Sequence, residues 1–138
     1  MTLKTYQKDL GLLILRIGIG AMFILHAIPK LTGGPAGWEG LAKFGLPFLP
    51  DGFIAIFFGF AAMAVELLGG LALALGKFHR VACLALAGVM FVAFTTKIGS
   101  VTGIGDFAKN AGWPLELLIV FVALFFTGPG RYVIGKKD

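Results

Sequence analysis

Four long apolar stretches constrain the fold of this chain more than any other feature. A helix needs about 20 mainly apolar residues to cross the hydrocarbon core of a bilayer. Stretches of about this length occur at residues 10–28, 53–75, 81–98 and 111–127. They are rich in Leu, Ala and Phe and lack the apolar–polar alternation of strands. The sequence therefore predicts an all-α fold, a single membrane domain over residues 1–138 built as a four-transmembrane-helix bundle.

The charge content agrees with this prediction. The chain is 58% hydrophobic and only 14% charged, whereas soluble domains carry about 25% charged residues. So few charges cannot cover a surface that faces water, and we expect membrane lipid to be the solvent. The net charge of +5 does not indicate nucleic acid as a partner, because the basic residues lie in short segments between apolar stretches.

The distribution of Lys and Arg predicts the orientation of the chain, because cytoplasmic loops carry an excess of both residues. Seven lie on the side of the two termini and four on the opposite side: Lys4, Lys8, Lys77, Arg80, Arg131, Lys136 and Lys137 against Lys30, Lys43, Lys97 and Lys109. We therefore expect a multi-pass protein of the cytoplasmic (inner) membrane of a prokaryote, with both termini in the cytoplasm.

The segment between the first two spans also has a helical pattern. Trp38, Leu41, Ala42 and Phe44 recur at helical spacing within residues 29–52. We interpret this part of the first outer loop as a short interfacial helix on the membrane surface. It acts either as a lid over the bundle or only as a loop held against it.

Charged residues within membrane spans are costly and often mark functional sites. With a helical rise of about 1.5 Å per residue, Arg16 and Glu66 lie roughly 10 and 15 Å from the inner ends of their spans. We therefore expect Arg16 to pair with Glu66 near the middle of the membrane. By the same rise, His26 and Lys97 lie roughly 24 Å from the inner side and Glu116 roughly 18 Å. We expect these three residues to form a second cluster toward the outer face.

The first span carries an interior stripe of polar and small residues with steps of three or four positions. Gly20 within it allows another helix or a ligand to approach the backbone closely. The stripe consists of Arg16, Gly20, Phe23, His26 and Lys30. From it we expect a ligand to contact Gly20, Phe23 and His26, and from the buried charges we take Glu66, Glu116 and His26 as candidate catalytic residues.

Each of these residues also has a structural interpretation. Arg16 and Glu66 could form only a clamp that orients the helices, since pairing is how buried charges are tolerated. Lys97 could extend its amine outward to water, and His26 could bond a neighbouring helix. Glu116 follows Pro114 in the first turns of its helix, where the helix dipole favours a carboxylate.

Several kinds of redox or metal centre are not expected. A haem between two histidines would need His26 and His79, which belong to opposite ends of the bundle. Cys83 is the sole cysteine, so no intramolecular disulfide forms, and we interpret it as a packing residue. We predict no metal site and no covalent cofactor.

Short motifs along nearly the whole chain support a family assignment. They comprise Leu15-Arg16-Ile17-Gly18 with Phe23, His26, Pro29, Lys30 and Leu31, then Phe44-Gly45-Leu46-Pro47, then Glu66-Leu67-Leu68-Gly69-Gly70 through Leu75-Gly76 and Arg80, and last Asn110, Gly112, Glu116 and Gly128-Pro129-Gly130. In their order and spacing the chain resembles the DoxX family of small membrane proteins, which includes the small membrane subunit of thiosulfate:quinone oxidoreductase. The resemblance implies a four-helix bundle and a link to quinone or sulfur redox chemistry, often through partner proteins. Where helix three of many relatives carries a histidine, this chain has Thr95, Thr96 and Lys97.

Three functions remain open from the sequence. In the first, the protein is the membrane subunit of a quinone-linked redox system acting on sulfur or thiol compounds. It would bind a quinone near Glu66 or Glu116, with a soluble redox partner protein handling the substrate. In the second, it is a non-catalytic anchor or assembly protein whose charges are clamps. In the third, it is a small transporter or proton pathway, which with four helices requires a homo-oligomer.

Overall fold

The computed structural model describes residues 2–135, which are helical almost throughout and contain no strand in that range. The elements are α1 (Leu3–Thr32), α2 (Gly34–Gly45), α3 (Phe53–Leu75), α4 (His79–Ile98), α5 (Ile104–Phe107), a π-helical turn η1 (Ala108–Gly112) and α6 (Trp113–Thr127). The last three form one continuous helix. Four helices are long and apolar enough to cross a membrane, namely α1, α3, α4 and the segment Ile104–Thr127. The expected all-α fold with four apolar helices is therefore confirmed.

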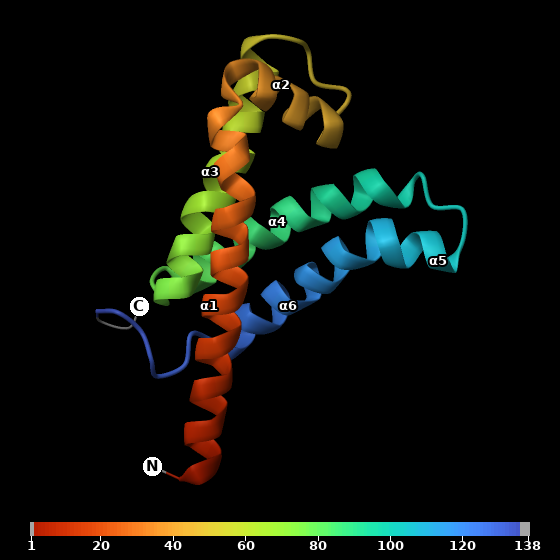
Figure 1. Cartoon of the computed structure of the whole chain (residues 1–138). Helices are drawn as coiled ribbons and strands as arrows, with labels where there is room; N and C mark the ends of the chain where they lie inside the picture. The colour runs from red at the N-terminus through yellow and green to blue at the C-terminus, as the bar shows by residue number, and fades with distance from the viewer. Residues whose placement is uncertain (1, 136–138) are drawn as a thin grey trace.

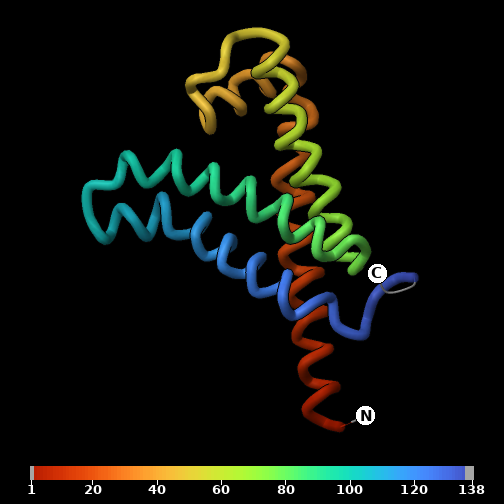
Figure 2. Tube along the Cα trace, turned by 180° about the vertical axis from the view of Figure 1, so that it is seen from behind, coloured from red at the N-terminus to blue at the C-terminus, as the bar shows by residue number. Residues whose placement is uncertain are grey.

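The four long helices form two hairpins. Figure 1 shows α1 and α3 side by side in one hairpin and α4 and α6 side by side in the other, and Figure 2 shows the same pairing from behind. The two hairpins diverge from the α3–α4 turn, so the predicted four-helix bundle is open at its other end. The helix α2 occupies the space between them, because its backbone at Trp38 packs on Gly59 of α3 and Gly45 contacts Val92 of α4.

The α1–α3 hairpin is built around two facing glycines. A Cβ atom at Gly20 would lie 2.5 Å from the carbonyl oxygen of Gly70, and one at Gly70 would lie 2.8 Å from that of Gly20. Both distances are too short for a real carbon–oxygen contact. The two backbones therefore approach as closely as they do only because neither position has a side chain, and this contact fixes the relative height of α1 and α3.

The α3–α4 turn is short and depends on a left-handed residue. Gly76 follows the last residue of α3 with φ of 75°. The amide of Lys77 donates to the carbonyl of Ala72 at 3.0 Å, a common way to end a helix. A side chain at Gly76 would also collide with the guanidinium of Arg16. The turn connects α3 to α4 within three residues.

The segment from α2 to the start of α3 is tied down by its own polar groups. The indole Nε1 of Trp38 donates to the carbonyl of Lys30 at 2.8 Å. The carboxylate of Glu39 accepts a bond of 2.7 Å from the amide of Gly52, just before α3. Lys43 forms an ion pair with Asp51. The expected short helix is present, and its charged side chains bond within this segment.

Candidate functional site

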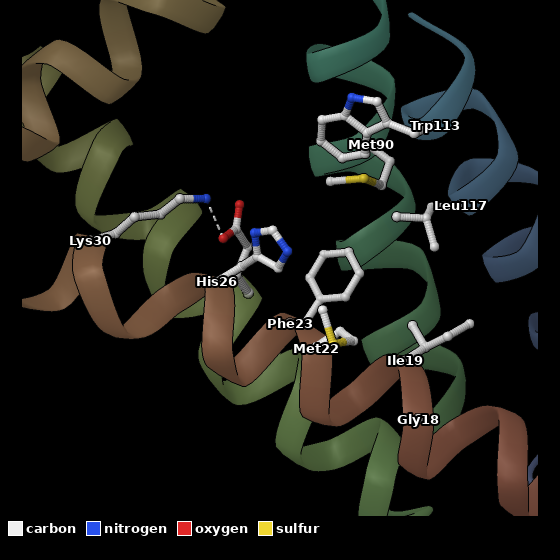
Figure 3. A pocket seen from close by; sticks show the side chains of 10 residues that line it. Gly18, Ile19, Met22, Phe23, His26, Lys30, Met90, Trp113 and Leu117 are labelled. Atoms are coloured by element: carbon white, nitrogen blue, oxygen red, sulfur yellow. Dashed lines mark hydrogen bonds and ion pairs between the residues drawn. The ribbon is translucent and has the colours of Figure 1, made fainter. Parts of the chain in front are cut away.

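The principal cavity lies where α1 faces α4 and α6. Its volume is about 410 Å³. Figure 3 shows the side chains of α1 facing Met90 of α4 and Trp113 and Leu117 of α6. The lining residues are Gly18, Ile19, Met22, Phe23, His26, Lys30, Glu66, Met90, Trp113 and Leu117. Most of the wall is apolar, and the three ionisable residues all belong to the end of the cavity nearer α2.

An ion pair between Lys30 of α1 and Glu66 of α3 forms the polar end of this cavity. Glu66 is 5% exposed. Lys30 is close to the end of α1, where a lysine in a membrane helix usually extends its amine toward water. Here the amine turns the other way, toward the buried carboxylate, which places a cation and an anion inside an apolar cavity.

The imidazole of His26 also lines the cavity, one turn of α1 before Lys30. In Figure 3 the ring lies beside the Lys30–Glu66 pair. Within residues 2–135 no protein group forms a hydrogen bond with His26, so its ring nitrogens are available to a ligand or to water. Phe23 and His26, which the sequence predicts as ligand contacts, both line the cavity, and Glu66, which it places in a different layer from His26, lies there with them.

Trp113 forms the wall opposite α1. The ammonium group of Lys97 lies 5.4 Å from the centre of the Trp113 ring, on its face. Such cation–π contacts orient an aromatic ring and are strongest away from water. Lys97 itself does not line the cavity, so its contact with the site passes through Trp113.

Arg16 does not pair with Glu66, contrary to the prediction from helix depth. Its Nη2 donates to the carbonyl of Tyr132 in the C-terminal segment. The reason is the register set by Gly20 and Gly70. Arg16 precedes Gly20 by four residues in one helix, and Glu66 precedes Gly70 by four residues in the antiparallel helix, so the two side chains start about 12 Å apart along the axis.

Arg16 instead belongs to a second polar cluster near the chain termini. It is fully buried beneath Gly76 at the end of α3, where the helix dipole favours a cation. Nearby in the same end of the molecule, the carboxylate of Asp9 accepts a bond of 3.1 Å from the amide of Arg131. Both contacts hold the C-terminal segment against α1, which is the clamp role weighed for Arg16, with a different partner.

The second predicted cluster, of His26, Lys97 and Glu116, is not formed. His26 lies with Lys30 and Glu66, Lys97 lies on Trp113, and Glu116 is exposed and outside the cavity. The neighbour Leu117 faces the cavity, and successive residues of a helix point about 100° apart, so Glu116 is turned away. Gly20 likewise faces α3 and not the cavity.

Cys83 and His79 lie elsewhere. Cys83 is fully buried in the apolar core, as expected of a packing residue. The Nε2 atom of His79 is 2.9 Å from the carbonyl of Leu124. Neither residue lines the cavity that contains His26. Among the described residues, no three His, Cys, Asp or Glu side chains are arranged to hold a metal ion.

Seven of the ten lining residues were not selected from the sequence, and Lys30, Met90 and Trp113 show why. Lys30 was present in the α1 stripe, four residues after His26, but its direction cannot be read from spacing. Met90 and Trp113 have no polar signal that marks them. Only the way α1 crosses α4 and α6 brings them together.

Comparison with known proteins gives the same assignment as the motifs. The sequence profile of the DoxX family matches residues 11–98, which is more than half of the chain. The chain belongs to the DoxX family. It is therefore a multi-pass membrane protein. It is also similar to the protein named "Putative oxidoreductase CatD" of Bacillus subtilis (strain 168), with 28% identity over 123 residues, covering 87% of this chain and 81% of that protein. No solved structure matches the chain.

The region that matches the DoxX profile includes every cavity residue contributed by α1, α3 and α4, among them Lys30 and Glu66. The wall contributed by Trp113 and Leu117 lies after it.

Proposed function

We propose that this protein is the membrane subunit of a quinone-linked oxidoreductase and that the cavity binds the quinone ring. One observation carries the proposal. An apolar cavity of about 410 Å³ has Lys30, Glu66 and His26 at one end. Small-molecule sites in proteins have this size and this combination of apolar walls with few polar groups.

The residues present fit such a ring. The ammonium of Lys30 is a donor suited to a carbonyl oxygen, and a protonated His26 is a second. Trp113 and Phe23 offer flat apolar surfaces to a ring, and the flexible Met90 adapts to its outline. A bound quinone accepts two electrons and two protons and becomes the quinol.

The protein side chains would supply the protons and hold the ring. In the absence of a ligand, Glu66 keeps Lys30 directed into the cavity. A positioned acid within hydrogen-bond reach of the oxygen can donate a proton; a protonated His26 is such an acid, and the carboxylate of Glu66 can serve after it has taken up a proton from water. Proton delivery is thus assigned to His26 and Glu66, and ring orientation to Lys30.

The electrons would come from a soluble partner protein that oxidises a thiol or sulfur compound. This part of the proposal follows from the DoxX family resemblance and agrees with the word oxidoreductase in the name of the Bacillus protein. The predicted orientation, with both termini in the cytoplasm, places α2 on the outer surface of the inner membrane. Its internally bonded charges suit an interfacial position there.

A second candidate is a non-catalytic anchor. It is favoured by the cluster of Arg16 and Asp9, whose contacts hold the C-terminal segment. This role predicts that variants which remove these charges lower the amount of protein in the membrane without changing the binding of any ligand.

Native mass spectrometry of the protein solubilised gently from its own membranes separates the two candidates. The proposal expects a stoichiometric quinone that is retained in the Glu116→Gln variant and lost in Glu66→Gln at equal protein abundance. The same spectra show any soluble protein partner or homo-oligomer. A wild-type protein that carries partner proteins but no quinone would support the anchor function.

A further inference from the structure

The structure contains two polar clusters at different heights, and their separation has a functional consequence. The upper cluster is Lys30, Glu66 and His26 in the cavity, and the lower cluster includes Arg16 and Asp9 at the end with the termini. Within the ion pair, the side chain of Glu66 is 7% exposed and that of Lys30, the member nearer α2, is 30% exposed, while His26 is exposed. Water can therefore reach the pair from the α2 end.

A layer without polar side chains separates the two clusters, and it includes the apolar wall of the cavity from Phe23 to Gly18. Its centre consists of Phe23, Leu73, Leu86 and Phe121, of which the last three are fully buried. The rings of Phe23 and Phe121 meet edge to face, with centroids 5.3 Å apart. Next to them the backbones of α1 and α3 touch at Gly20. These contacts pack the interior beside the apolar end of the cavity, which reaches Gly18.

The same layer is apolar along every helix that surrounds it. No ionisable, hydroxyl or amide side chain occurs at residues 17–25 of α1, 67–75 of α3, 84–94 of α4 or 117–126 of α6. Apolar interiors stay dry, and moving a charge through them without a partner is very costly. No chain of proton-bonding groups therefore connects Glu66 with Arg16 through the described residues.

We infer that the site formed by Lys30, Glu66 and His26 exchanges its protons only with the side of the membrane that carries α2. The inference rests on the proposed function for the meaning of these protons, but the sealed layer is a property of the fold alone. It also disfavours a proton pathway that crosses the whole protein. Reduction of a ring in this cavity would take its protons from the α2 side and none from the side of the termini.

Cysteine labelling tests the inference directly, and the chain suits it because Cys83 is its sole cysteine. In a Cys83→Ala background, His26→Cys places a thiol in the cavity and leaves the Lys30–Glu66 pair intact. A membrane-impermeant methanethiosulfonate reagent reacts with thiolates, which form only where water reaches. It is added to sealed vesicles of known orientation, from one side at a time.

Two further cysteine variants report labelling from each side of the membrane. Asp51→Cys reports the α2 side, since the Asp51 side chain is 77% exposed. Thr5→Cys, near the start of α1 and exposed, reports the side of the termini. The inference expects His26→Cys to react at least ten-fold faster from the side that labels Asp51→Cys. Lys30→Cys should follow the same side.

Equal rates from both sides, faster reaction from the side of Thr5→Cys, or no reaction from either side would overturn the inference. The assay contains no quinone. A protein that shows one-sided labelling but retains no quinone would therefore refute the proposed function and leave the sealed layer intact.

Discussion

The closest helix contact gives a prediction that can be worked out in detail. In Gly20→Ala the new methyl carbon would lie 2.5 Å from the carbonyl oxygen of Gly70 and 2.9 Å from the Cβ of Ala74. Carbon–oxygen contacts in proteins rarely fall below about 3.3 Å. The two helices must therefore separate by about 0.8 Å at this point, which disturbs their contact over neighbouring turns.

The expected magnitude combines two opposing effects. Overpacking of this kind costs about 1–3 kcal/mol, whereas replacing Gly by Ala within a helix gains about 0.5–1 kcal/mol. We expect Gly20→Ala to lower the free energy of unfolding by about 1–2 kcal/mol. Gly11→Ala is the matched control, since it lies in the same helix and nothing stands within 4 Å of its Cβ position.

The free energy of unfolding is measured by titrating SDS into mixed micelles that contain the protein and following helical circular dichroism. The control should be unchanged or slightly more stable than the wild type. If Gly20→Ala proves as stable as Gly11→Ala, the close contact of α1 and α3 at this position is wrong, and so is the register derived from it.

Three further changes probe the parts around the site. Lys30→Met leaves the carboxylate of Glu66 without its partner, and we expect the free energy of unfolding to fall by about 2–3 kcal/mol in the same assay. The double variant Lys30→Met with Glu66→Gln should recover at least half of this loss. Additive losses would show that the pair does not interact. Gly59→Ala should displace the α2 backbone that packs on this glycine, seen as faster hydrogen exchange of α2 amides, whereas unchanged exchange would contradict that packing. The hydrogen bond and charge of Asp51 raise the pKa of Lys43, so the pair contributes fully to stability at neutral pH and this contribution is lost only as pH rises through the raised pKa. An NMR titration should show that Asp51→Asn lowers the pKa of Lys43 toward its ordinary value. An unchanged pKa of Lys43 would exclude the pair in solution.

Hydropathy alone predicts the four long helices, because lipid permits few other arrangements of a chain so poor in charge. The turn at Gly76 can also be predicted, since a left-handed residue after an apolar helix favours glycine. The ends of the helices are less predictable. The first helix begins at Leu3 and not near residue 10, because its polar first turns extend beyond the apolar stretch.

The pairing of charges depends on quantities that spacing does not contain. Helix rise places Arg16 and Glu66 at similar depths only if both spans end at the same level, and the contact of Gly20 with Gly70 sets a different register. The rotation of α6 decides that Leu117 faces the cavity and Glu116 does not. Both the register and the rotation follow from packing between helices, which a single sequence does not specify.

The central claim, that the cavity binds a quinone ring, is tested most directly by the fluorescence of Trp113. The other tryptophan, Trp38, does not line the cavity, so Trp38→Phe leaves one reporter in its wall. We expect a short-chain quinone titrated into nanodiscs to quench this fluorescence saturably. The apparent affinity for the quinone, taken from the quenching curve, should fall at least ten-fold in Glu66→Gln and stay unchanged in Glu116→Gln. Linear quenching without saturation, equal in all three proteins, would contradict the claim.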